Sequence, residues 1–89
     1  MKILVTDDSK MARKMVIKTL NESTNIQLEI LEAQNGAEAL ELYKQNLPKL
    51  VFLDLTMPIM DGFETLEKIK EFDKNAKVII ISADIQKLS

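Results

Sequence analysis

The segment LVFLDLTMPIMDG, residues 50–62, decides the fold class that this 89-residue chain can adopt. It begins with an uninterrupted apolar run, which is typical of a short buried strand. The strand ends at Asp54, and the loop that follows contains Pro58. Asp61 can then cap a helix that runs to about Phe72. A buried strand, a loop that begins with a carboxylate and a helix, in this order, favour an α/β protein.

The rest of the chain repeats this alternation of apolar runs and amphipathic stretches. The expected strands cover residues 3–5, 28–33, 50–53 and 78–81. The expected helices run from a cap at Ser9 to about 21, from 35–36 to about 46 and from 61 to about 72. A further helical turn is expected at 84–89. Strands that alternate with helices at these intervals indicate βαβ units in a doubly wound parallel sheet. The 28–33 run mixes apolar and charged residues, which favours an edge strand. We see no repeat or linker, so we expect residues 1–89 to form one domain.

Two of the expected helices carry an apolar stripe at helical spacing. In the first helix the stripe consists of Met11, Ala12, Met15, Val16, Thr19 and Leu20, and in the third it consists of Phe63, Leu66 and Ile69. We expect both stripes to be buried. The remaining face of the first helix carries Lys10, Arg13, Lys14 and Lys18, which we expect to be solvated.

Composition excludes several classes of function. The chain has 12 basic and 14 acidic side chains and a net charge of −2, which gives no reason to expect nucleic-acid binding. It contains neither cysteine nor histidine, so disulfides, thiolate chemistry, Cys/His zinc sites and histidine catalysis are excluded. The apolar run at residues 3–5 is far too short for a signal peptide or a membrane span. We therefore expect a cytoplasmic protein with no membrane partner.

Polar side chains stand where three of the expected strands end. Asp7 and Asp8 follow the first strand, Asp54 follows the third and Ser82 follows the fourth. In a sheet of strand order 2-1-3-4 the first and third strands are neighbours, so three carboxylates would converge where α/β sheets bind ligands. Their repulsion raises a pKa or recruits a cation, and an all-oxygen donor set suits Mg²⁺. Such a site predicts phosphoryl transfer, with a carboxylate as the nucleophile.

The chain resembles the receiver domain family of response regulators, especially its small chemotaxis (CheY-like) members, in three separated motifs. These are Thr6-Asp7-Asp8-Ser9, then Leu53-Asp54-Leu55 with Met57-Pro58 and Asp61-Gly62, and last Ile81-Ser82-Ala83. The resemblance implies a flavodoxin-like fold and a phosphoryl group received from a histidine kinase. It also implies a phosphoacceptor that assists its own phosphorylation and dephosphorylation and is not otherwise an enzyme.

The same resemblance assigns roles to single residues. Asp54 is implied to be the phosphoacceptor and Asp8 a direct Mg²⁺ ligand. Asp7 is implied to hold the ion mainly through water, and the backbone carbonyl of Thr56 to complete the protein ligands beside Asp54. Ser82 is implied to be the switch hydroxyl that hydrogen-bonds the phosphoryl oxygen, next to the small Ala83. For Asp61, by contrast, the residue pattern favours a helix cap over a metal ligand.

The family has five βα units, whereas this sequence accounts for three and a fourth strand. We therefore expect the chain to lack most of a fourth helix and all of a fifth strand and helix, including a lysine that ends the fifth strand. An alternative hypothesis follows: a fragment that does not signal and self-associates as a homo-oligomer through an uncovered sheet face or the edge of its fourth strand. A third hypothesis, a haloacid-dehalogenase-type phosphatase, needs a second aspartate two residues after the nucleophile, where Thr56 stands.

Overall fold

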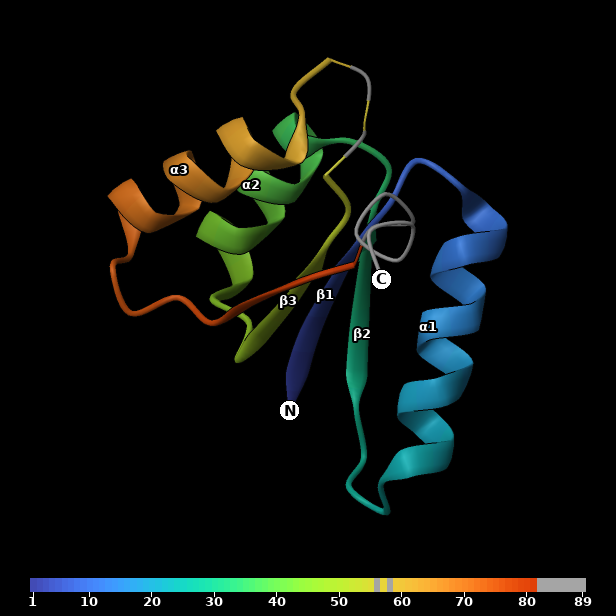
Figure 1. Cartoon of the computed structure of the whole chain (residues 1–89). Coiled ribbons are helices and arrows are strands. Elements are labelled where there is room, and N and C mark those ends of the chain that lie inside the picture. Colours follow the sequence, from blue (N-terminus) through green and yellow to red (C-terminus); the bar gives the residue numbers. More distant parts are fainter. Residues whose placement is uncertain (56, 58, 82–89) are drawn as a thin grey trace.

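The computed structural model describes residues 1–55, 57 and 59–81, in which strands and helices alternate along the chain (Figure 1). The elements are β1 (Lys2–Thr6), α1 (Lys10–Ser23), β2 (Glu29–Ala33), α2 (Gly36–Asn46), β3 (Leu50–Leu53), α3 (Gly62–Phe72) and β4 (Val78–Ile80). This is the predicted order of elements, with ends that differ from the prediction by at most two residues. The helical turn expected at 84–89 lies outside the described residues.

Local sequence signals account for the starts of all three helices. The side chains of Ser9, Asn35 and Asp61 each accept a hydrogen bond from a backbone N–H three residues further on. These bonds satisfy donors that a helix leaves unpaired in its first turn. The prediction that Asp61 caps a helix is therefore confirmed.

The sheet has the strand order β2-β1-β3-β4, and all neighbouring strands run parallel. Val5 of β1 is level with Phe52 of β3, which is level with Ile79 of β4. The predicted α/β class and strand order are confirmed, and β2 lies at an edge as its mixed composition suggested. Because β1 and β3 are adjacent and parallel, their carboxyl ends meet at the same place.

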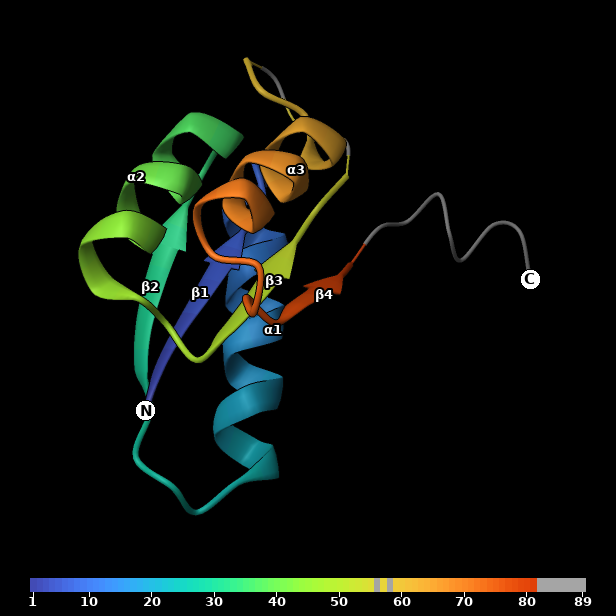
Figure 2. The same ribbon diagram turned by 90° about the vertical axis from the view of Figure 1, so that its left-hand side faces the viewer.

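The helices cover the two faces of the sheet unequally, with α1 on one face and α2 and α3 on the other (Figures 1 and 2). The main core lies between the sheet and the α2/α3 pair. It is built around fully buried side chains: Leu4, Val51, Leu53, Tyr43 and Ile69. None of the helices in the described part of the chain is long and apolar enough to cross a membrane.

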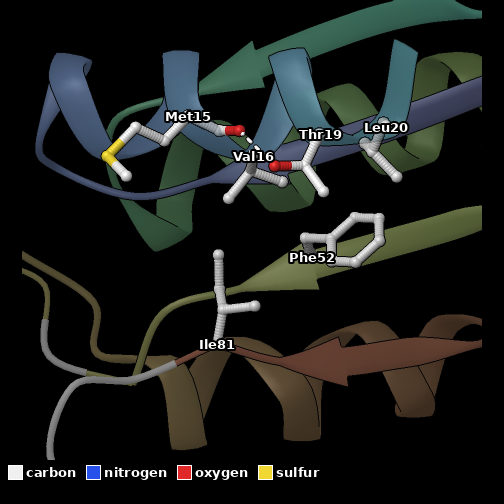
Figure 3. Close-up of a pocket in the computed structure, with 6 residues that line it drawn as sticks. All are labelled: Met15, Val16, Thr19, Leu20, Phe52 and Ile81. Atoms are coloured by element: carbon white, nitrogen blue, oxygen red, sulfur yellow. Dashed lines mark hydrogen bonds between the residues drawn. The ribbon is translucent and has the colours of Figure 1, made fainter. Parts of the chain in front are cut away.

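On the other face, α1 leaves an apolar groove between itself and strands β3 and β4 (Figure 3). The groove has a volume of about 290 Å³ and is lined by Met15, Val16, Thr19, Leu20, Phe52 and Ile81. Among the neighbouring elements in the described part of the chain, α1 packs chiefly on β1.

Two expectations about helix faces are wrong. Met11 and Met15 of α1 are 74% and 66% exposed, whereas Arg13, expected in solvent, is buried. Phe63 of α3 is 67% exposed, whereas Ile69 is buried as expected and Leu66 is partly buried against the core; Gly62 and Thr65 complete the buried face. Adjacent helical residues point about 100° apart, so each helix faces the sheet with a side that is turned about the helix axis relative to the side that its apolar pattern predicted.

Candidate metal centre at the ends of β1 and β3

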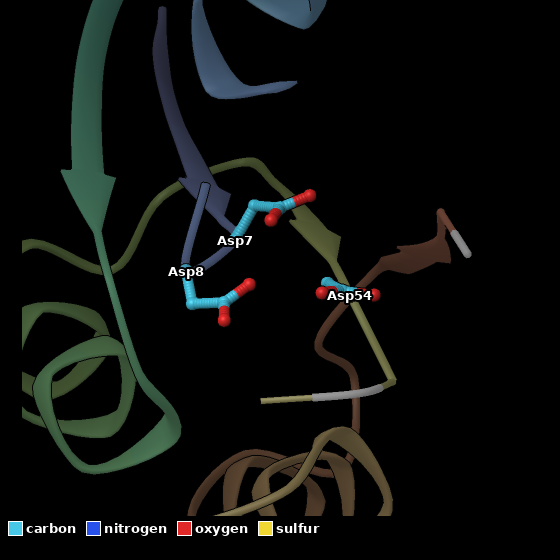
Figure 4. Close-up of side chains that lie close together, drawn as sticks. All are labelled: Asp7, Asp8 and Asp54. Carbon is cyan, nitrogen blue, oxygen red and sulfur yellow. The ribbon is translucent and has the colours of Figure 1, made fainter. Parts of the chain in front are cut away.

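Three aspartates stand where β1 and β3 end (Figure 4). Asp7 and Asp8 follow β1 directly, and Asp54 follows β3. The sheet ladder extends into both ends, because the Asp54 N–H donates to the Thr6 carbonyl at 3.0 Å and the Asp7 N–H donates to the Ala33 carbonyl at 3.1 Å. The backbones that carry these carboxylates are therefore positioned by the sheet itself.

The structure brings the three carboxylates together, as their places at the strand ends suggested. One oxygen from each of Asp7, Asp8 and Asp54 lies within 4.8 Å of the other two. Asp54 is 6% exposed and Asp7 is 9% exposed, whereas Asp8 faces solvent. The cluster thus has two buried members and one open side from which an ion or a phosphoryl donor could enter.

The electrostatics of the cluster favour a bound cation. Burial raises the pKa of Asp7 above its ordinary value, and the charges of Asp54 and Asp8 raise this pKa further. A hydrogen bond of 2.9 Å from the Ser9 N–H to Asp7 Oδ1 acts in the opposite direction. The fold therefore holds negative charges at close range at a cost in free energy, and a cation would relieve it. Carboxylate oxygens without nitrogen or sulfur donors fit a hard ion such as Mg²⁺.

The loop after Asp54 is held against the start of α3. The N–H of Gly62 donates to the Leu55 carbonyl at 3.0 Å. A Cβ atom on Gly62 would lie 2.4 Å from the Asp54 carbonyl oxygen and 2.5 Å from the Leu55 Cα, closer than non-bonded atoms approach. Glycine is therefore required here, which supplies a physical reason for a residue that sequence reasoning knew only through resemblance.

Sequence reasoning missed one residue beside the cluster. Arg13 of α1 donates from Nη1 to the Asp7 carbonyl oxygen at 2.7 Å and from Nε to Glu32 Oε1 at 2.9 Å. In the sequence it is one of four basic residues on a helix, and nothing in the local pattern separates it from Lys14. Two other predicted site residues, Thr56 and Ser82, lie outside the described residues.

Comparison with protein families gives one match over nearly the whole chain. The family described as response regulator receiver domain matches residues 3–88. Among curated proteins, the chain is 43% identical over 82 residues to the chemotaxis protein CheY of Bacillus subtilis, covering 92% of this chain and 67% of that protein. It is 47% identical over 85 residues to the chemotaxis protein CheY of Treponema pallidum, covering 92% and 57% respectively.

Solved structures give the same picture. The CheX–CheY–BeF₃–Mg²⁺ complex from Borrelia burgdorferi contains a chain that matches with a TM-score of 0.85 and 39% identity, over 92% of this chain and 61% of that one. Response regulator protein TrrA from Thermotoga maritima, in complex with Mg²⁺ and BeF, matches with a TM-score of 0.84 and 36% identity, over 92% and 69%. The chain thus spans roughly three fifths to two thirds of the length of these relatives.

Proposed function

This chain belongs to the response regulator receiver domain family, and we propose that it is the phosphoacceptor of a two-component phosphorelay, with Asp54 as the accepting side chain. The observation that carries the proposal is the convergence of Asp7, Asp8 and Asp54, whose oxygens lie within 4.8 Å of one another. Among the three, Asp54 is the most buried, and its N–H is held by the central β1–β3 pairing, which supports Asp54 as the side chain that attacks.

In the proposed reaction, a carboxylate oxygen of Asp54 forms a bond to the phosphorus atom of a phosphohistidine donor. The phosphorus–nitrogen bond breaks, and the imidazole nitrogen keeps the electron pair and takes a proton from solvent. Asp7 and Asp8 would hold Mg²⁺ together with Asp54, Asp8 directly and Asp7 mainly through water. Bound Mg²⁺ would neutralise charge on the transferring phosphoryl oxygens. Thr56, through its carbonyl, and Ser82, through its hydroxyl, complete the proposed site.

Members of this family are phosphoacceptors and are not generally classed as enzymes. The assistance that this chain gives to its own phosphorylation and dephosphorylation is part of the proposal. So is a histidine kinase as the donor, and so is a role in chemotaxis, which the resemblance to chemotaxis proteins supports. The proposed place of action is the cytoplasm, which microscopy of a fluorescently labelled chain in cells would test.

The test is phosphorylation by a small acyl phosphate, followed by intact mass spectrometry. We expect the chain to gain one phosphoryl group with Mg²⁺ and to gain little in EDTA. Asp54→Asn should gain none. Asp61→Asn is the matched control, because asparagine caps a helix as well as aspartate does and should leave phosphorylation unchanged. A full phosphoryl gain by Asp54→Asn would refute the assignment.

A second candidate function is self-association, for which the groove beside α1 is the supporting observation. The groove is lined mainly by apolar side chains of α1 and β3 and by Ile81, which directly follows β4, the last strand of the sheet in the described part of the chain. On β4, Ile79 is 44% exposed. A second copy of the chain offers both an open strand edge for backbone pairing and an apolar face of the same kind, so we propose a homo-oligomer through this side.

Light scattering at tens of micromolar tests the second candidate. The chain should have a mass above that of a monomer, and Ile79→Lys should reduce it by placing a charge on the open edge. Ile26→Lys is the control, since Ile26 is also exposed, at 60%, but lies in the α1–β2 connection. A strictly monomeric wild-type chain would exclude this candidate and leave the phosphoacceptor proposal untouched.

A further inference from the structure

Arg13 makes contacts that a solvated helical arginine does not make. Its side chain is only 11% exposed, and it forms an ion pair with Glu32. The guanidinium binds in two directions at once: Nε donates to Glu32 Oε1 at 2.9 Å, and Nη1 donates to the Asp7 carbonyl oxygen at 2.7 Å. A buried guanidinium loses much of its hydration, so both bonds contribute to keeping it inside the fold.

The hydrogen bond to the Asp7 carbonyl affects the orientation of the next residue, Asp8. The peptide group is planar, so the carbonyl oxygen of Asp7 and the N–H of Asp8 belong to one rigid unit. When Arg13 holds that oxygen, it fixes the orientation of the plane through which the chain enters Asp8. Asp8 is exposed, and unlike Asp7 it does not belong to a strand ladder. The direction of its side chain therefore depends on the peptide that precedes it and on the interaction of its carboxylate with that of Asp7.

The other contacts of the loop act on Asp7. The Asp7 N–H donates to the Ala33 carbonyl, and the Asp7 carboxylate accepts from the Ser9 N–H at 2.9 Å. Arg13 supplies the contact on the side of the peptide that faces Asp8. Glu32, which follows Leu31 on β2, holds the guanidinium from the far side and balances its charge. The clamp thus connects α1, the loop and β2.

We propose that Arg13 is a positioning residue for the metal centre: by holding the Asp7 carbonyl, it orients Asp8 toward the space shared with Asp7 and Asp54. The inference rests on the proposed function, because it needs these carboxylates to bind Mg²⁺. The expected change in Mg²⁺ affinity on loss of Arg13 is also opposite in sign to a simple charge effect. A positive charge near the site repels a cation, so loss of that charge alone would strengthen Mg²⁺ binding, whereas loss of the clamp weakens it.

The test compares Mg²⁺ dissociation constants, measured by isothermal titration calorimetry on the full 89-residue chain. In Arg13→Met, which keeps most of the side-chain length, we expect affinity to fall by about tenfold or more, as is typical when a residue that orients a metal ligand is removed. In Arg13→Lys the charge remains, but one ammonium group cannot reproduce the forked contact to both oxygens, so affinity should also fall.

Tyr43→Phe is the control for a general loss of stability. It removes a hydrogen bond to Asp73 at the opposite end of the sheet and should leave the Mg²⁺ dissociation constant unchanged. Affinity in Arg13→Met equal to or tighter than that of the wild type would overturn the inference and leave the proposed function intact. If Arg13→Met does not fold, Arg13→Lys decides by the same criterion. Failure of the wild-type chain to bind Mg²⁺ would overturn the proposed function first.

Discussion

Gly62 faces the backbone of Asp54 so closely that a Cβ atom on the glycine would lie 2.4 Å from the Asp54 carbonyl oxygen. The first residue of α3 and the residue that follows β3 thus lie in close contact, and the Gly62 N–H donates to the carbonyl of Leu55, the residue after Asp54. The position of the candidate phosphoacceptor therefore depends on a helix that begins eight residues later in the sequence.

Gly62→Ala should lower the free energy of unfolding by about 1–3 kcal/mol, because the added methyl group meets backbone atoms that cannot rotate away. Helix propensity works in the opposite direction, since alanine favours a helix by about 1 kcal/mol over glycine. Urea unfolding followed by circular dichroism measures the difference. Glu67→Ala, at an exposed position of the same helix, is the control and should change stability by less than about 0.5 kcal/mol. A Gly62→Ala variant as stable as the wild type would contradict the close contact.

Tyr43→Phe should cost about 1 kcal/mol of stability at neutral pH, the usual contribution of a hydrogen bond between side chains. The Tyr43 hydroxyl, in a buried side chain of α2, donates to Asp73 Oδ2 at 2.8 Å, and this bond ties α2 to the end of α3. Asp73→Asn keeps an acceptor at this place, so it should cost less than Tyr43→Phe. Equal stability of Tyr43→Phe and the wild type would show that the bond contributes nothing.

The raised pKa of Tyr43 predicts that the stability of the fold falls at alkaline pH. Burial, and then the hydrogen bond to Asp73 and its charge, raise the pKa of Tyr43 from 10.0 to about 12. Because the folded-state pKa lies above the unfolded value, the stabilisation is complete below pH 10 and is lost as the pH rises from 10 toward 12. Tyr43 is the only tyrosine, so absorbance of the phenolate reports on it alone. A titration midpoint near 10 in the folded chain would contradict the prediction.

Mg²⁺ should stabilise the wild-type chain, by about 2.7 kcal/mol at a concentration one hundred times its dissociation constant. The effect of Asp54→Asn on stability should differ between EDTA and Mg²⁺. In EDTA it should be more stable than the wild type, because one of three clustered charges is gone. In Mg²⁺ it should gain less, because a ligand is gone. Thermal unfolding with and without the ion measures both effects. An equal gain in stability for the two proteins would show that Asp54 is not part of the metal site.

Much of the fold could be predicted from the sequence because its signals are local. The apolar run at residues 50–53 and the caps Ser9, Asn35 and Asp61 each mark an element without reference to distant residues. The strand order then placed Asp7 and Asp54 side by side, so the convergence of the carboxylates followed from topology. The convergence of the three carboxylates could be predicted from the strand order alone, without knowledge of side-chain packing.

The parts that could not be predicted depend on how helices rotate against the sheet. Arg13 is buried and Met15 is exposed, the reverse of what the sequence predicted. The side of α1 that faces the sheet is set by packing and not by the apolar pattern of the helix alone. The role of Arg13 also needs a carbonyl six residues earlier and a carboxylate on β2, a combination that no single window of sequence displays. Phe63 is exposed for the same rotational reason.

The most direct test of the central claim is to locate the phosphoryl group by chemistry. Borohydride reduces an aspartyl phosphate to homoserine, which peptide mass spectrometry assigns to one position in the chain. After phosphorylation with Mg²⁺ and an acyl phosphate, followed by reduction, we predict homoserine at position 54 and at no other aspartate. Homoserine at Asp7, Asp8 or Asp61, or a phosphoryl group that resists reduction because it sits on a hydroxyl, would contradict the account.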